Sequence, residues 1–181
     1  TDARVFEAPY LSICSSLPRA ELQALPPDVG FLQAVAAAPS GEINYDMAVK
    51  AGGENFYLAA SGDWCPTAII NEGADQFTTQ LTYSGGVGTR RVVPGMAVLW
   101  GDEVCRLDSI TEDGQVELGR GCADTAPQAH APGERCWFVV DTADDVTEYV
   151  AGEELEVKLL ANTSSQQYPL VGASSEFIEI E

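Results

Sequence analysis

Apolar and polar residues alternate along much of the chain, which is the pattern of β-strands that bury one face and expose the other. In residues 154–161 the first six positions alternate between charged and apolar side chains. Counted over the whole chain, such runs predict roughly eight to ten strands of ordinary length. The other strand-like runs are 31–38, 44–51, 55–61, 68–72, 76–83, 96–100, 103–110, 115–119 and 135–141.

Two dipeptides predict tight hairpin turns between neighbouring runs. Gly101-Asp102 joins 96–100 to 103–110, and Asp113-Gly114 joins the end of that run to 115–119. Glycine takes a positive φ at no steric cost and aspartate tolerates one, which is what such turns require. The turn residues therefore predict three consecutive antiparallel strands.

Three other segments give a weaker or different signal. The alanine content of 31–38 favours a helix, but its position before Pro39 and a further strand-like run favours a hairpin arm, and we expect a strand. The glycine-rich stretch 84–88 predicts a flexible break. Residues 16–25 predict a short helix that ends at Pro26.

The fold class that follows is mainly β, an antiparallel β-barrel or β-sandwich with one short N-terminal helix. No helical runs separate the later strands, so a parallel α/β fold is excluded. We expect residues 1–62 to form the helix and a hairpin subregion, and residues 63–181 to form the barrel or sandwich, within one compact unit. Because the chain starts at Thr1 and ends in the strand-like run 176–181, we expect a segment cut from a longer polypeptide.

Charge limits the partners of the protein. The 28 acidic and 9 basic side chains give a net charge of −19, which repels phosphate backbones, and we expect no direct nucleic-acid binding. No apolar run approaches the roughly 20 residues of a spanning helix, and we expect no membrane insertion. Residues 141–181 carry ten carboxylates and one lysine. They predict either a solvated acidic face or a surface for a basic partner or a hard cation.

Cysteine usage leaves three alternatives open. The five cysteines, at positions 14, 65, 105, 122 and 136, are an odd number, and small buried thiols in a reducing compartment are the simplest interpretation. A disulfide between Cys105 and Cys136 is a second possibility. A zinc site from Cys105, Cys122, His130 and Cys136 is a third, but no close C-x-x-C pair supports it. The acidic run 141–148 lacks the spacing of an EF-hand loop, and we interpret it as a solvated turn. We expect no metal and no cofactor.

Few residues offer catalytic chemistry. His130 is the only histidine, and in its proline-flanked loop we expect it to bond loop carbonyls and fix the path of the loop. A small hydrolase that uses His130 with Asp124 and a nucleophile, Ser109 or Cys122, is the alternative. A glycosidase pair of Glu103 and Asp108 is disfavoured, because their positions along one strand place them on opposite faces.

Arg120 and the tryptophans complete the candidate residues. Arg120 lies between Gly119 and Gly121, where the backbone can approach another strand, and its guanidinium can bridge loop carbonyls or carboxylates such as Asp124. We expect it to organise the 120–134 loop. Trp64, Trp100 and Trp137 are interpreted as core residues; if exposed on one face, they would instead stack on sugars in a carbohydrate-binding module.

The segment 119–137, GRGCADTAPQAHAPGERCW, resembles a segment of the tail tip hub proteins of long-tailed bacteriophages, prophages and gene transfer agents. In that family a strand that ends in Gly-Arg-Gly precedes a Thr, a Pro, an Ala-His-Ala and a Gly before an aromatic strand. Residues 2–10, 61–68 and 147–160 also resemble the family. The matching positions are Gly119, Arg120, Gly121, Thr125, Pro127, Ala129, His130, Ala131, Gly133 and Trp137.

The resemblance implies a virion structural protein and not an enzyme. It implies a central hub domain of the virion tail, made in the bacterial host cytoplasm, that contributes to tail tip assembly, host attachment and DNA delivery. Implied partners are other tail tip and baseplate proteins, with a homotrimer in the full-length hub. Cys105 and Cys136 depart from the family, which would have aliphatic residues at these strand positions.

Overall fold

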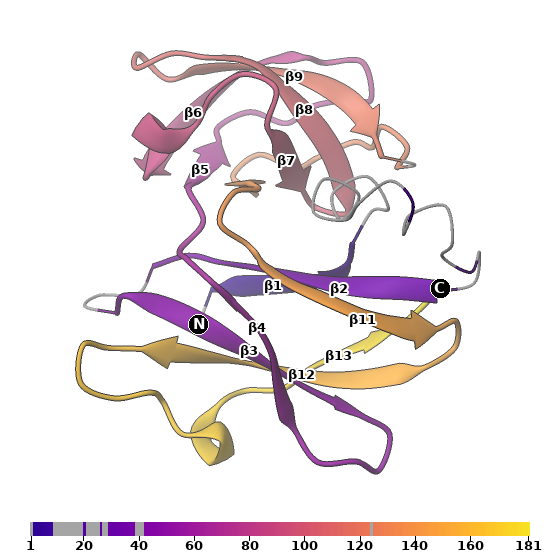
Figure 1. The fold of residues 1–181 in the computed structure, drawn as a ribbon. Helices are drawn as coiled ribbons and strands as arrows, with labels where there is room; N and C mark the ends of the chain where they lie inside the picture. The colour runs from indigo at the N-terminus through magenta and orange to yellow at the C-terminus, as the bar shows by residue number, and fades with distance from the viewer. Residues whose placement is uncertain (1, 9–19, 21–25, 27–28, 39–41, 124) are drawn as a thin grey trace. The chain divides into compact units, whose positions relative to one another are not determined.

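The computed structural model describes residues 2–8, 20, 26, 29–38, 42–123 and 125–181. Antiparallel strands dominate these residues, which confirms the mainly β fold class, and one sheet closes into a barrel (Figure 1). The helix predicted for 16–25 lies, apart from Ala20, outside the described residues. No helix in the described part of the chain is long and apolar enough to cross a membrane.

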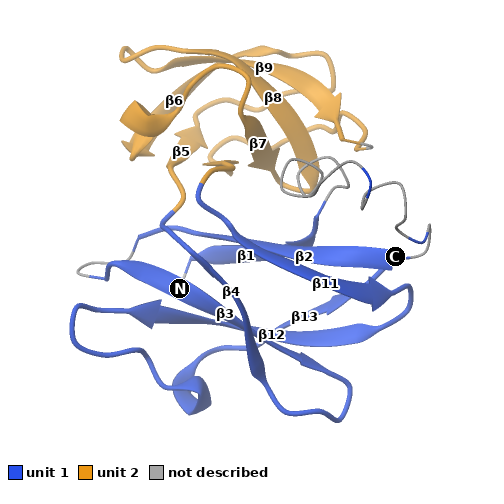
Figure 2. Cartoon of the chain, in the orientation of Figure 1, with its two compact units in different colours: residues 1–64, 141–181 blue, residues 65–140 orange. Residues whose placement is uncertain are grey.

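The chain divides into two compact units, coloured separately in Figure 2. Unit 1 contains residues 1–64 and 141–181, and unit 2 contains residues 65–140. The regions predicted from the sequence were residues 1–62 and residues 63–181. In the structure, the last forty-one residues of the chain, 141–181, belong to the same unit as residues 1–64.

Unit 1 consists of two antiparallel sheets that share one apolar core (Figure 1). One sheet has the order β1 (Ala3–Glu7), β2 (Val29–Ala36), β11 (Ala143–Val150). The other has the order β13 (Glu176–Glu179), β12 (Glu154–Asn162), β3 (Asn44–Ala51), β4 (Tyr57–Gly62). A short 3₁₀ turn, η2 (Leu170–Gly172), lies between β12 and β13.

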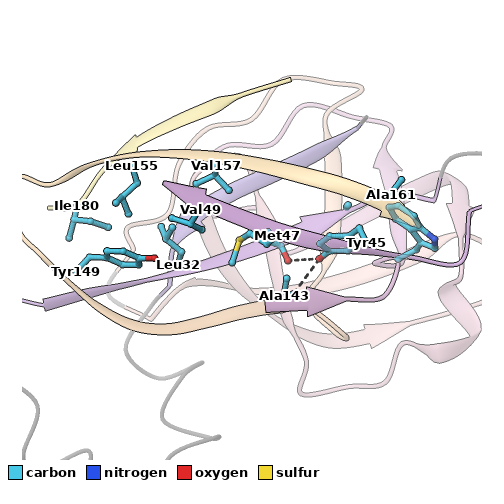
Figure 3. Packing of buried hydrophobic residues seen from close by; sticks show 13 residues of the cluster. Leu32, Tyr45, Met47, Val49, Ala143, Tyr149, Leu155, Val157, Ala161 and Ile180 are labelled. Carbon is cyan, nitrogen blue, oxygen red and sulfur yellow. Dashed lines mark hydrogen bonds between the residues drawn. The ribbon is translucent and has the colours of Figure 1, made fainter. Parts of the chain in front are cut away.

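The alternation along β12 buries its apolar side as predicted. Leu155 and Val157 are almost fully buried, and β12 pairs with β3 in register from Leu155↔Ala51 to Asn162↔Asn44. Figure 3 shows the side chains of both sheets that meet in this core. The strand expected at 31–38 is confirmed as β2, so its alanines serve a closely packed sheet and not a helix.

The prediction of a solvated turn at 141–148 is wrong, because β11 occupies most of that run. Ala143 and Tyr149 are buried on the inner side of β11. Asp145 is also buried, and it accepts hydrogen bonds from the Tyr149 hydroxyl and the Thr147 N–H. A carboxylate can be buried in a strand when nearby donors form hydrogen bonds with it. The number of acidic residues in the run does not show whether such donors are present.

Unit 2 is a closed six-stranded antiparallel barrel with the order β10-β5-β6-β9-β8-β7. Its strands are β5 (Thr67–Ile70), β6 (Gln80–Val87), β7 (Ala97–Trp100), β8 (Glu103–Ile110), β9 (Gln115–Cys122) and β10 (Arg135–Phe138), with a 3₁₀ turn η1 (Thr89–Arg91) after β6.

The two hairpin turns predicted in this unit are confirmed. β7 and β8 pair across Gly101, which has φ 58°, and β8 and β9 pair across Gly114, which has φ 89°. The flexible break predicted at 84–88 is wrong for most of its length, because β6 continues to Val87. The ladder between β5 and β6 instead contains a register shift, which accommodates Gly85 at φ 60° without ending the strand.

Candidate functional site

The segment 119–137 begins in β9 and ends in β10, and the long connection between these strands is pinned to the barrel. His130 and Ala74 exchange backbone hydrogen bonds of 2.8 and 3.0 Å, which form an isolated antiparallel bridge. The Gly133 N–H donates to the Ile70 carbonyl at 2.8 Å. The part of the loop around residues 130–133 is therefore held against the barrel wall.

Glu103, the first residue of β8, is the centre of this arrangement. Its side chain has no exposed surface, and its two oxygens accept six hydrogen bonds. Oε1 accepts from Arg120 Nε, the Gly121 N–H and the Cys105 thiol, at 2.8, 2.8 and 3.3 Å. Oε2 accepts from Arg120 Nη2, the Gln128 N–H and His130 Nε2, at 2.7, 2.9 and 3.1 Å.

Arg120 connects this carboxylate to the loops around it. Its Nε and Nη2 grip Glu103 as a two-pronged pair, and its side chain is only 4% exposed. Nη1 donates to the carbonyls of Asp75 and Thr78, and Nη2 also donates to the Gln128 carbonyl at 2.6 Å. One guanidinium thus fixes residues from three separate segments of unit 2.

His130 has a carboxylate at each ring nitrogen. Nε2 lies 3.1 Å from Glu103 Oε2 and Nδ1 lies 2.9 Å from Glu134 Oε2. Both ring nitrogens are therefore within hydrogen-bonding distance of a carboxylate oxygen. The ring also stacks on Trp100, with centroids 3.9 Å apart and planes 13° from parallel. Glu103, Arg120, His130 and Glu134, with Trp100 against the ring, form one largely buried polar cluster.

Electrostatics keep Glu103 ionised. Burial by itself raises the pKa of its carboxyl, but the hydrogen bonds from Arg120, Gln128, His130 and Gly121 outweigh burial and hold the pKa well below its usual range. The effect on Cys105 is the opposite, since burial and the nearby Glu103 charge raise the pKa of its thiol to about 12. This thiol is therefore a weak donor and not a nucleophile at neutral pH.

Gly121 is required by the same arrangement. It has φ 60°, and a Cβ at this position would lie 2.5 Å from Pro127 Cδ. Any side chain would push the loop away from β9 and move the N–H that Glu103 binds. Glycine here allows the close approach of backbone and proline ring.

Of the residues selected from the sequence, the structure brings Glu103, Cys105, Arg120, Gly121, His130 and Trp100 together. Asp124 lies outside the described residues. Gly119 lies beside Arg106 and Asp108, away from the cluster. Glu103 had been considered only as one of a glycosidase pair; it is buried, whereas Asp108 binds Arg106 near the surface. The sequence signal that could have identified Glu103 is its position on the same side of the strand as Cys105 and Leu107.

The arrangement offers little to a substrate. His130 is 3% exposed at its side chain, and both of its ring nitrogens face carboxylates, so neither is open to take a proton from Ser109 or Cys122. This geometry argues against the small hydrolase. What the cluster does is to hold a long loop on the barrel.

The tryptophans do not form a sugar-binding platform. Trp64, Trp100 and Trp137 are 9%, 0% and 4% exposed, so their faces are not available for stacking. Trp100 packs against His130 and lies 5.0 Å from the Arg120 guanidinium, as part of the same cluster. The carbohydrate-binding alternative required exposed tryptophans, and these three are buried.

Cys105, Cys122 and Cys136 are free thiols. Cys65, Cys105 and Cys136 are buried and Cys122 is half-buried, while Cys14 lies outside the described residues. The disulfide considered between Cys105 and Cys136 is not formed. Within the described ranges no three His, Cys, Asp or Glu side chains converge in a way that could hold a metal ion.

Comparison with known proteins does not add to this geometry: no protein-family model matches the chain, and no curated protein matches it.

Proposed function

We propose that the chain is a structural module of a phage or prophage tail tip hub and contributes to tail tip assembly, host attachment and DNA delivery. One observation carries the proposal. The residues of the resembling segment that have distinctive chemistry, Arg120, Gly121 and His130, all bind the buried carboxylate of Glu103. A sequence pattern that serves loop architecture, with no exposed reactive group, suits a structural protein.

The proposal includes the setting that the resemblance implies. The module belongs to the virion tail, is made in the host cytoplasm, and assembles with other tail tip or baseplate proteins as part of a homotrimeric hub. It acts without catalysis. Its net charge of −19 suits a protein that DNA passes without binding.

Immunogold electron microscopy tests the proposal directly. Antibodies against residues 1–181 are applied to particles released, after prophage induction, from the bacterium that carries the gene. We expect label at the end of the tail distal to the capsid. Label on capsids, or on the cell envelope with unlabelled particles, would contradict the proposal.

Genetic complementation adds a matched pair of variants. Deletion of the gene should stop the release of tailed particles, and the wild-type gene should restore it. Asp108→Asn, which removes a carboxylate near the barrel surface, should also restore release, whereas Glu103→Ala should not. If both variants restored release equally, the buried cluster would not be needed for tail assembly.

A further inference from the structure

A cleft of about 250 Å³ lies in unit 1, outside the segment 119–137. Its apolar wall is the inner side of β12, formed by Val157, Leu159 and Ala161. Two carboxylates line it, Glu42 and Glu176. None of the described lining residues is basic. The cleft is therefore apolar along one side and negatively charged.

Glu42 is the unexplained group in this cleft. Its Oε2 atom is buried and has no hydrogen-bond partner. Its backbone is held in place, because the Trp64 Nε1–H donates to the Glu42 carbonyl at 3.2 Å. A buried carboxylate oxygen without a donor is costly, so the Glu42 side chain would be stabilised if it turned this oxygen toward an N–H donor held in the cleft that it lines. Glu176 differs, since it is exposed and its Oε2 accepts from the Val5 N–H.

The chemistry of the cleft selects among cations. A hard ion such as Ca²⁺ takes six to eight oxygen ligands, which a wall of valine, leucine and alanine cannot supply. The volume is below the roughly 300–1,000 Å³ of pockets that hold drug-sized molecules, so only a small or narrow group fits. An alkylammonium group matches both features, because its methylenes pack on the apolar wall while its three N–H donors face carboxylates.

We propose that this cleft binds an alkylammonium group, and that its occupant in the assembled protein is a lysine side chain of a basic partner protein. The charge of −19 favours a basic partner over a neutral one, since it attracts and orients such a protein before contact. The acidic segment 141–181, which supplies β12 and Glu176, is where the sequence predicted either a solvated face or such a surface. The inference does not rest on the tail hub proposal.

Titration of the whole chain with butylammonium tests the site without any variant. Binding is followed by the NMR methyl signals of Ala3, Ala161 and Ala173, which line the cleft. We expect saturable shifts confined to the cleft, with 1-butanol, which has the same chain without the charge, binding at least tenfold more weakly. Equal binding of the two probes, or no shift at these methyls, would overturn the proposal.

Variants then locate the charge that is responsible. Glu42→Gln keeps the shape of the side chain and should weaken butylammonium binding about tenfold. Glu179→Gln is the matched control, because Glu179 lies on the same strand as Glu176 but does not line the cleft, and binding should be unchanged. If Glu42→Gln fails to fold, the ratio of butylammonium to butanol binding in the wild type still decides the matter.

The source of the amine is a separate arm of the experiment. A short peptide with one lysine is compared with the same peptide acetylated at that lysine. Shifts at the three alanine methyls from the free lysine alone support a partner protein as the source. Binding of butylammonium with no response to the lysine peptide would overturn the assignment to a partner, and would identify the cleft as a site for small free amines.

Discussion

The two units of this chain bury their side chains in different ways. The core of unit 1 is largely apolar across both sheets (Figure 3), and its few polar side chains bond backbone groups or one another. Tyr45 is an example, since its hydroxyl donates to the Ala34 carbonyl and accepts from the Ala143 N–H. Unit 2 instead encloses a carboxylate, a guanidinium and an imidazole.

The difference follows from what each unit has to hold. In unit 1 the strands are paired over long stretches, and apolar burial is enough to keep two sheets together. In unit 2 three of the six strands have only four residues, and a long connection must be kept on the barrel. Hydrogen bonds from Glu103 and Arg120 fix the position of that connection, because they depend on direction and apolar contacts do not. The comparison predicts that unit 1 is sensitive to lost volume and unit 2 to lost charge.

Removal of the Glu103 carboxylate should have the largest effect. Glu103→Ala leaves the Arg120 cation buried without its partner, and breaking a buried pair in this way costs about 3–5 kcal/mol. Hydrogen exchange measured by mass spectrometry should show faster exchange throughout 65–140 and little change in unit 1. Asp108→Asn is the control, and its exchange should match the wild type. Faster exchange in both units alike would contradict the division of roles.

A cavity in the apolar core should have a comparable but smaller effect on the other unit. Leu155 is fully buried between the sheets of unit 1, and Leu155→Ala should cost about 2–5 kcal/mol. The same exchange experiment should show the loss in β2, β3 and β12. Leu58→Ala is the control, because Leu58 is 62% exposed and its removal leaves no cavity. If Leu155→Ala changed only residues 65–140, the two cores would not be independent.

The sequence predicted those elements that local pattern determines. The runs 44–51 and 103–110 match β3 and β8 residue for residue, since alternation and glycine turns act over short distances. The sequence did not predict β11, because its acidic composition suggested a turn. The donors that stabilise the buried Asp145 lie within four residues of it, and composition does not reveal them. The sequence left barrel and sandwich open, because it did not show the closure that pairs β10 with both β5 and β7. Such long-range pairings leave no local signal.

The same limit applies to the candidate site. A lone histidine and an arginine between glycines drew attention to His130 and Arg120 from the sequence itself. Their common partner did not stand out, because Glu103 is 17 residues from Arg120 and 27 from His130. The orphan oxygen of Glu42 had no sequence signal, since only the packed sheets create it.

Acid should weaken the charged cluster selectively. The folded-state pKa of Glu103 lies below its ordinary value of 4.5, so its contribution to stability is fully present above that pH and is lost as the pH falls toward the folded pKa. The stability difference between the wild type and Glu103→Gln should therefore shrink by about 2 kcal/mol from pH 6 to pH 3. Urea unfolding at several pH values measures it. A difference that stayed constant would mean that the Glu103 charge does not stabilise the fold.

The smallest effect is expected where unit 1 does contain a buried carboxylate. Burial raises the pKa of the Tyr149 hydroxyl, and its hydrogen bond to Asp145 adds to the effect, so the hydroxyl remains a donor between Asp145 and Tyr57. Tyr149→Phe should cost about 1–2 kcal/mol by urea unfolding, because Asp145 keeps the Thr147 N–H. Tyr168→Phe, at an exposed tyrosine, should cost nothing measurable.

The size of the Tyr149→Phe effect decides how far the comparison between the units holds. Asp145 accepts its hydrogen bonds from its own strand, whereas Glu103 accepts them mainly from β9 and from the connection after β9, so loss of one donor at Asp145 should stay local. If Tyr149→Phe instead cost as much as Glu103→Ala, both units would depend on a buried carboxylate. The contrast would then be one of composition only, and an apolar core alone would not explain the stability of unit 1.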